Sequence, residues 1–212
     1  MIDLISAPLF HGFFLSLAMI LAIGSQNIFI LKQGMSGRYV LTACLTSSLC
    51  DAALIILGAM GLGKLVTSQK TMQLSLCLAG SMFLAFYAWG ALRQFMRSSG
   101  SNLETKNETK NSMKKIIVMS VAFSLLNPHA WLDTVVVMGS VSSQYNESLQ
   151  LLAFTIGACL VSFTWFFLLG FLAKYFRQFL LMAKVQRGLN LFVAIIMGTI
   201  SFSLARYSLT LF

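Results

Sequence analysis

The sequence predicts an all-α integral membrane protein with six transmembrane helices, and three observations support this fold class. Of the 212 residues, 58% are hydrophobic and only 10% are charged, whereas a soluble domain carries about 25% charged residues. Apolar runs of about 20 residues, long enough to cross about 30 Å of hydrocarbon, recur along the chain. Stretches that contain Lys and Arg separate these runs. The chain therefore lacks the polar surface that a water-soluble fold needs.

The apolar runs fall into two groups of three. We expect the six helices at residues 9–31, 40–63, 72–95, 115–142, 149–173 and 188–210. A polar segment at 97–114, whose composition predicts a flexible loop, separates a first half (1–96) from a second half (115–212). Because each half has an odd number of crossings, the second half enters the membrane from the opposite side. This is the plan of an inverted repeat, although the two halves share little sequence identity.

The basic residues predict the orientation. Twelve of the fifteen Lys and Arg residues lie in or next to the loops that follow the first, third and fifth expected spans. These loops are all on the same side of the membrane, and the second of them is the central loop. The positive-inside rule then places this loop in the cytoplasm and both termini outside. A five-span arrangement would also keep the loop cytoplasmic, but residues 9–31 and 40–63 are each long enough to span. The net charge of +9 follows this distribution, so we expect no nucleic-acid partner.

The first span of each half contains a polar cluster that weakens a helix. These clusters are GSQN at 24–27 and NPHA at 127–130, with Gly24 and Pro128 as the expected helix breaks. Proline removes a backbone donor and crowds the carbonyl four residues earlier. In hydrocarbon, the freed groups must be satisfied by protein or by cavity water. A simple kink is one interpretation, but breaks in corresponding spans are how transporters build sites near the midplane.

Two of the six acidic residues, Asp51 and Asp133, lie deep in apolar sequence. A charged aspartate at such a position costs about 2.5–3.5 kcal/mol on insertion scales and indicates function by default. Asp133 follows His129 by four residues, and Asp51 follows Ser47 and Ser48 by about one turn, so each has polar neighbours on its own helix face. The alternative interpretation is a buried carboxyl that joins two helices by hydrogen bonds.

Three features resemble the basic amino-acid exporters of the LysE superfamily, and most closely its lysine and arginine exporter branch. They are GSQNIFILKQG at 24–34, Asp51 within the second span, and NPHAWLDTVVVMG at 127–139. The resemblance covers essentially the whole chain. Members that resemble neutral amino-acid or homoserine exporters typically have a PGPN-like first motif and an NPK-like second motif. The resemblance therefore implies export of L-arginine and/or L-lysine across the bacterial inner membrane, driven by protons or by the membrane potential.

The residues are compatible with this function. A cationic substrate needs a carboxylate in a low-dielectric cavity, and amide side chains can bind its carboxylate and amine. The expected substrate-binding residues are Asp133, Asp51, Gln26, Asn27, Asn127 and His129. One carboxylate can hold a proton or the substrate's cation but not both, so alternating access would give proton antiport. We assign Asp133 to the substrate and Asp51 to the proton, and the reverse assignment stays open. We expect no cofactor and no metal.

Other functions remain as alternatives. Within transport, these are export of neutral amino acids or of other small metabolites, and a passive channel. Outside transport, a membrane-embedded enzyme could use His129 with Asp133 and Asp51, but one histidine without an HExxH pair is a poor ligand set. We therefore expect no enzyme. A scaffold subunit whose buried acids pair with a partner's cations is a further alternative outside transport. Membrane lipids are expected contacts, and a homodimer through glycine-containing faces is a hypothesis.

Overall fold

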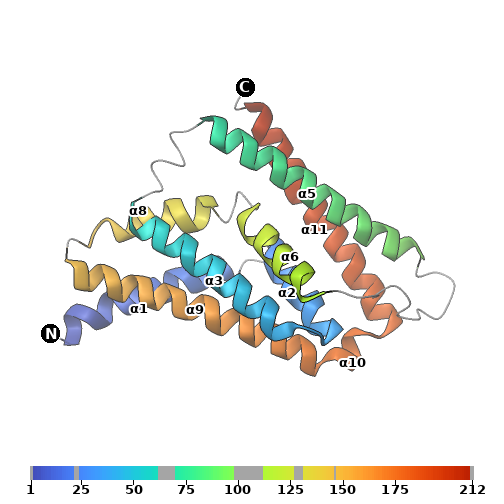
Figure 1. Ribbon diagram of the computed structural model, residues 1–212, viewed down its shortest axis with the longest axis horizontal. Helices are drawn as coiled ribbons and strands as arrows, with labels where there is room; N and C mark the ends of the chain where they lie inside the picture. Colours follow the sequence, from blue (N-terminus) through green and yellow to red (C-terminus); the bar gives the residue numbers. More distant parts are fainter. Residues whose placement is uncertain are drawn as a thin grey trace.

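Helices form all the regular structure in the part of the chain that the computed structural model describes, residues 2–21, 24–61, 70–97, 112–126, 131–145 and 147–210. This confirms the all-α prediction. In chain order (Figure 1), the elements are α1 (Ile2–Ile20), α2 (Ser25–Ser36), α3 (Val40–Ala59), α5 (Lys70–Arg97), α6 (Met113–Leu125), the π-helix η1 (Trp131–Val137), α8 (Met138–Ser142), α9 (Ser148–Tyr175), α10 (Arg177–Leu180) and α11 (Ala183–Thr210).

Several of these helices can cross a membrane. Within the described ranges, α3, α9 and α11 are long and apolar enough to do so, and α1 with α2 passes the same test as one bent span. Helix α5 has 28 residues, or about 40 Å of helix, which exceeds the thickness of the hydrocarbon core. The chain is therefore a multi-pass membrane protein. The arrangement of six spans in two halves stays a prediction, since the fourth expected span crosses residues 127–130, outside the described ranges.

The first expected span is two helices rather than one. Helix α1 ends at Ile20, and α2 begins at Ser25, directly after Gly24, which has an extended backbone (φ −104°, ψ 179°). The two helix axes differ by 78°. The span also extends further than the expected residues 9–31, because α1 begins at Ile2 and α2 continues to Ser36. Hydrophobicity alone misses this extension, since the polar end of α2 is covered by protein.

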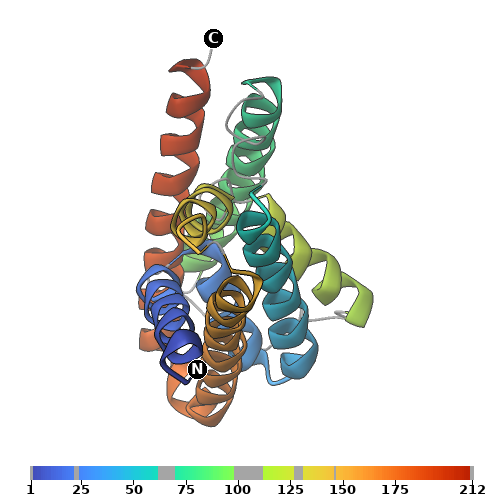
Figure 2. The same ribbon diagram turned by 90° about the vertical axis from the view of Figure 1, so that its left-hand side faces the viewer.

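Helix α9 is the scaffold on which both parts of this broken span rest (Figures 1 and 2). A side chain added at Gly157 of α9 would collide with the carbonyl oxygen of Leu9 in α1. A Cβ added at Gly34 of α2 would lie 2.5 Å from the carbonyl oxygen of Gly170 in α9. Glycine thus lets α1 and α2 each pack on α9 at backbone contact, which fixes the two sides of the break.

Helices α5 and α11 form an antiparallel pair that stands beside the other helices (Figures 1 and 2). Aromatic side chains join this pair to α6. The rings of Phe83 and Tyr87 on α5 each have their centroids 4.8 Å from that of Phe123 on α6. In the most hydrophobic 18-residue stretch of α11, only 17% of the residues are buried, compared with 44% in the corresponding stretch of α3. Most of α11 therefore faces away from the protein interior.

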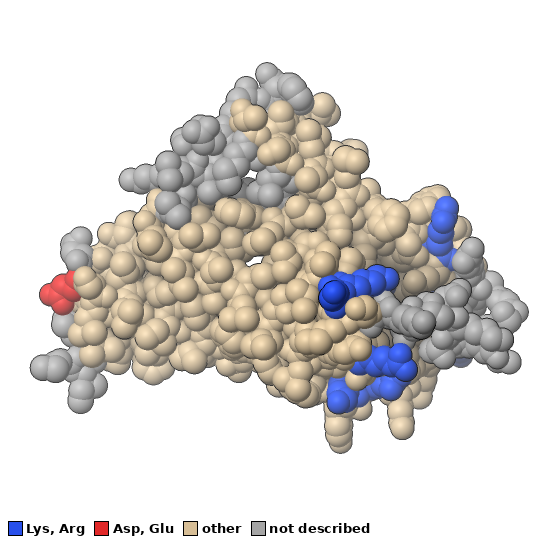
Figure 3. All heavy atoms as spheres, in the orientation of Figure 1, with Lys and Arg blue, Asp and Glu red and all other residues tan. Residues whose placement is uncertain are grey.

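Basic side chains gather at one end of the molecule, as Figure 3 shows on the face in view, while the acidic side chain visible there lies at the opposite end. At the basic end, α2 joins α3, and α9 joins α10 and α11. The prediction that most basic residues share one side agrees with this distribution. Which side is cytoplasmic stays a prediction. Most of the expected central loop falls on residues 98–111, outside the described residues.

Candidate functional site

Asp51 lies buried on α3, with 8% of its surface exposed, and is held by α9. The hydroxyl of Ser162 on α9 donates a hydrogen bond to Asp51 Oδ2 at 2.9 Å. One turn before Asp51, the Ser48 hydroxyl donates to the Ser162 carbonyl oxygen at 3.4 Å. The polar face expected around Asp51 therefore points at the scaffold helix, and Ser162 is its partner there.

Gln26 brings the break of the first span to the same place. It is the second residue of α2, and its side chain lies close enough to the Asp51 carboxyl group to interact with it. Its Nε2 donates to the Ser124 hydroxyl at 2.9 Å. Ser124 lies in the last turn of α6, where it donates to the Ser120 carbonyl oxygen at 2.9 Å. The start of α2 and the end of α6 thus meet beside Asp51.

Two buried hydroxyls on α3 and α6 have no hydrogen-bond partner among the described residues. They belong to Ser47, one turn before Asp51 on α3, and to Ser120, one turn before Ser124 on α6. Leaving a buried polar group unsatisfied costs about 1–3 kcal/mol. Helices α3 and α6 pack against each other, and each of these hydroxyls lies one turn from a polar residue of the site, Asp51 or Ser124.

Asn27 stabilises the break itself. Its Nδ2 donates to the carbonyl oxygen of Ile20, the last residue of α1, at 2.8 Å. Its Oδ1 accepts from the indole N–H of Trp165 on α9 at 3.1 Å. A carbonyl freed at a helix end needs such a partner in hydrocarbon. Asn27 thus has a structural task, and its assignment as a substrate ligand stays a prediction.

Asp133 lies on η1. The structure describes the backbone of Asp133 but not its side chain. The η1 segment packs on α3, and its Thr134 carbonyl oxygen would lie 2.9 Å from a Cβ added at Gly58. Gly58 is seven residues after Asp51, about 10 Å along the helix. Short π-helical segments are frequent at functional sites. Asn127, Pro128 and His129 lie outside the described residues, so their predicted roles stay predictions.

Sequence reasoning did not identify the serines that surround Asp51 from other helices. Ser120 and Ser124 are one turn apart in a part of α6 that is otherwise apolar, and that spacing was the available signal for a polar face. Ser162 had no comparable signal. Serine is common in membrane helices because its hydroxyl can bond to a carbonyl of the preceding turn. Only the fold shows that Ser162 points at a carboxylate.

The arrangement defines a class of protein. A helical membrane protein with a buried carboxylate beside a broken helix has features from which membrane transporters build their substrate sites. In the part of the chain that the structure describes, no group of three or more His, Cys, Asp or Glu side chains could hold a metal ion. The polar residues gathered around Asp51 are mainly serine and glutamine, which suit hydrogen bonding to a small polar solute.

Comparison with known proteins supplies the family. The model of the LysE type translocator family matches residues 17–208, so this chain belongs to that family, which comprises transporters rather than enzymes. The resemblance seen in the sequence motifs is thereby confirmed. No solved structure matches the chain significantly.

Relatives named "Arginine exporter protein ArgO" are similar to nearly all of the chain. The protein of this name from Photorhabdus laumondii subsp. laumondii is 38% identical over 200 residues, which cover 94% of this chain and 95% of the relative. That of Pectobacterium carotovorum subsp. carotovorum is 37% identical over 202 residues, covering 95% and 98%. That of Salmonella paratyphi A is 38% identical over 197 residues, covering 93% and 92%.

Proposed function

We propose that this chain exports L-arginine across the bacterial inner membrane and that Asp51 lies at the centre of the transport site. One observation carries the proposal: a buried carboxylate, bonded to Ser162, lies beside Gln26 where the first span is broken. In apolar surroundings such a carboxylate is a strong partner for a cation. The printed name of the relatives supports arginine as the cation. L-lysine is the second substrate, which the sequence motifs also favour.

The site suits both ends of an arginine molecule. Asp51 would pair with the guanidinium group, which can donate two parallel hydrogen bonds to a carboxylate. The N-terminus of α2 would bind the substrate's carboxylate, since Gly24 provides no side-chain cap and a helix N-terminus carries partial positive charge. Gln26 lies between these two positions and can bond to either group.

Proton coupling follows from the competition for one carboxyl group. In the state open to the cytoplasm, Asp51 would release its proton and accept the substrate's cation. In the state open to the outside, it would release the substrate and take up a proton. We place both steps on Asp51, whose described surroundings include the Ser162 hydroxyl and Gln26, instead of dividing them between Asp133 and Asp51. Asp133, Asn127 and His129 stay predicted as further substrate ligands.

The proposal can be tested by transport into inverted membrane vesicles, where export becomes uptake. Radiolabelled arginine, lysine, threonine and leucine would be compared in wild type, Asp51→Asn and Glu147→Gln. Glu147 is an exposed acid outside this site and serves as the matched control. We expect uptake of arginine, and more weakly of lysine, in wild type and the control but not in Asp51→Asn. Uptake of the neutral amino acids, or normal transport by Asp51→Asn, would overturn the proposal.

A further inference from the structure

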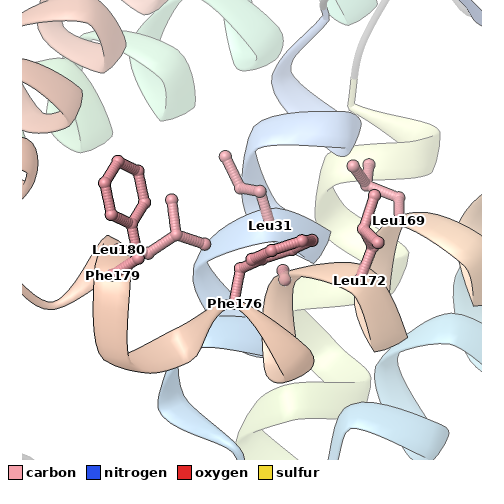
Figure 4. A pocket seen from close by; sticks show the side chains of 7 residues that line it. Leu31, Leu169, Leu172, Phe176, Phe179 and Leu180 are labelled. Atoms are coloured by element: carbon pink, nitrogen blue, oxygen red, sulfur yellow. The ribbon is translucent and has the colours of Figure 1, made fainter.

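An apolar groove of about 640 Å³ opens between α2, α9 and α10 at the basic end of the molecule (Figure 4). Leu31 of α2 lies on one side, facing Phe176 and Leu172 on the other. All its lining side chains are apolar: Leu31, Leu169, Leu172, Ala173, Phe176, Phe179 and Leu180. This groove is lined by none of the residues placed around Asp51, so it is separate from the transport site.

Two cations stand at the rim of this groove. A neighbouring hollow of about 750 Å³ shares Phe176 and Phe179 with the groove and is also lined by Lys174 and Arg177. The Arg177 guanidinium extends over the turn between α2 and α3, where its Nη1 would lie 3.1 Å from a Cβ added at Gly37. Both basic side chains are exposed. Positive charge therefore borders the open side of an apolar groove.

The described acidic side chains do not neutralise these cations. Asp51 is buried on α3 against Ser162, and Glu147 lies at the start of α9, whereas Lys174 lies at its end. The segment from α9 to α11 is also typical of a membrane interface. Tyr175 is 82% exposed, and Phe179 is also exposed, so exposed aromatic side chains lie close in sequence to Lys174 and Arg177. Aromatic and basic side chains are enriched at membrane–water interfaces, so this composition favours a position of the rim near the lipid headgroups.

We propose that this groove and its rim bind one anionic phospholipid. Its phosphate would contact Arg177 and Lys174, and an acyl chain would lie between Leu31 and Phe176. Charge complementarity supports this occupant over a zwitterionic lipid, which would fill the groove but gain little from the two cations. Each basic residue near an anionic lipid surface strengthens binding roughly fivefold.

Native mass spectrometry of the full-length protein tests the proposal. The purified protein would be equilibrated with equal amounts of phosphatidylglycerol and phosphatidylcholine with the same acyl chains. Wild type is expected to retain phosphatidylglycerol preferentially. In Lys174→Gln with Arg177→Gln, this preference is expected to fall roughly fivefold for each charge removed. The matched control, Lys184→Gln with Arg187→Gln, removes two charges from the start of α11, outside the groove, and is expected to keep the preference.

A further variant tests the acyl-chain part of the site. Leu172→Trp keeps both cations but fills the groove, so it is expected to lose phosphatidylglycerol while remaining monodisperse in size-exclusion chromatography. No preference in wild type, or an equal loss in both charge variants, would overturn the proposal. It would also be overturned if phosphatidylglycerol bound only after Glu104→Gln with Glu108→Gln, because the acidic residues of the central loop would then be the occupants of the rim.

Discussion

At the scale of single residues, the partners of Asp51 among the described side chains are neutral groups, not a fixed cation. The Ser162 hydroxyl donates to it, and Gln26 lies within reach. Removing a fixed cationic partner leaves a buried charge uncompensated at a cost of several kcal/mol. A hydroxyl, in contrast, can rotate and bond to either form of the carboxyl group. These surroundings suit the exchange of a proton for a substrate cation that we propose for Asp51.

Ser162→Ala tests this role. A hydrogen bond to a charged group contributes about 1.5–3 kcal/mol, so we expect arginine transport to fall about tenfold or more. The control is Thr164→Ala, two residues further along α9, whose hydroxyl donates to the Leu160 carbonyl oxygen of the same helix at 2.7 Å. Initial rates in inverted vesicles would be normalised to the amount of protein. Equal rates in the two variants would contradict a role for Ser162 at the site.

Asn27→Ala tests the bonds at the break. The Ile20 carbonyl oxygen would lose the donor that Asn27 provides, and we expect the free energy of unfolding to fall by about 1–3 kcal/mol. Trp165→Phe removes only the bond to Asn27 Oδ1 and keeps the donor to Ile20. It should therefore be milder. Thermal unfolding in detergent measures both, and a Trp165→Phe protein less stable than Asn27→Ala would contradict this account.

The site was only partly predictable at this scale. Asp51 was identifiable because an acid inside apolar sequence needs a physical reason. Its partner Ser162 was not, because 111 residues separate the two and nothing in the spacing of serines specifies contact between α3 and α9. The roles predicted for the Asp133 side chain and for the NPHA cluster at 127–130 stay predictions, which transport measurements must test.

At the scale of elements, helix ends were predicted well where hydrophobicity alone decides them. The expected spans 40–63 and 149–173 correspond to α3, Val40–Ala59, and α9, Ser148–Tyr175. The expected span 9–31 corresponds to two helices, α1 and α2. The sequence did not predict this bend, because hydropathy does not show whether the helix axis changes direction. GSQN indicated where the helix weakens, but the 78° bend depends on how α1 and α2 each pack on α9.

This packing predicts a difference between two glycines. In Gly157→Ala, the new methyl group would collide with the Leu9 carbonyl oxygen, so α1 and α9 must separate. We expect a loss of about 1–3 kcal/mol in unfolding free energy. Gly90→Ala on α5 is the matched control, since no atom lies within 4 Å of the added Cβ. Alanine should stabilise that helix by up to about 1 kcal/mol. Destabilisation of equal size in both variants would contradict the close crossing.

At the scale of the whole molecule, the fold collects basic residues from distant parts of the chain at one end (Figure 3). Lys174 and Arg177 lie far in sequence from Arg38, yet the α2–α3 turn and α10 are neighbours there. The positive-inside rule favours this end as the cytoplasmic one. The orientation proposed for export depends on it, because substrate must enter the site from the cytoplasm.

Cysteine labelling tests the orientation. Gln178→Cys lies on α10 at the basic end, and Ser143→Cys lies just after α8, near the opposite end; both positions are exposed. A membrane-impermeant maleimide is expected to label Ser143→Cys in intact cells and Gln178→Cys only in inverted vesicles. The unmodified chain measures labelling of the four native cysteines. The reverse pattern would show that the basic end faces outward.

The low burial of α11 has a consequence for how the chain tolerates random change. Because only 17% of its most hydrophobic stretch is buried, most side chains of this helix face lipid. A lipid-facing position can accept any side chain of similar hydrophobicity. Positions on α3 meet neighbouring helices more often, and there shape and hydrogen bonding matter as well. In a library of single substitutions selected for resistance to a toxic arginine analogue, apolar replacements should therefore survive along most of α11 and be depleted along α3.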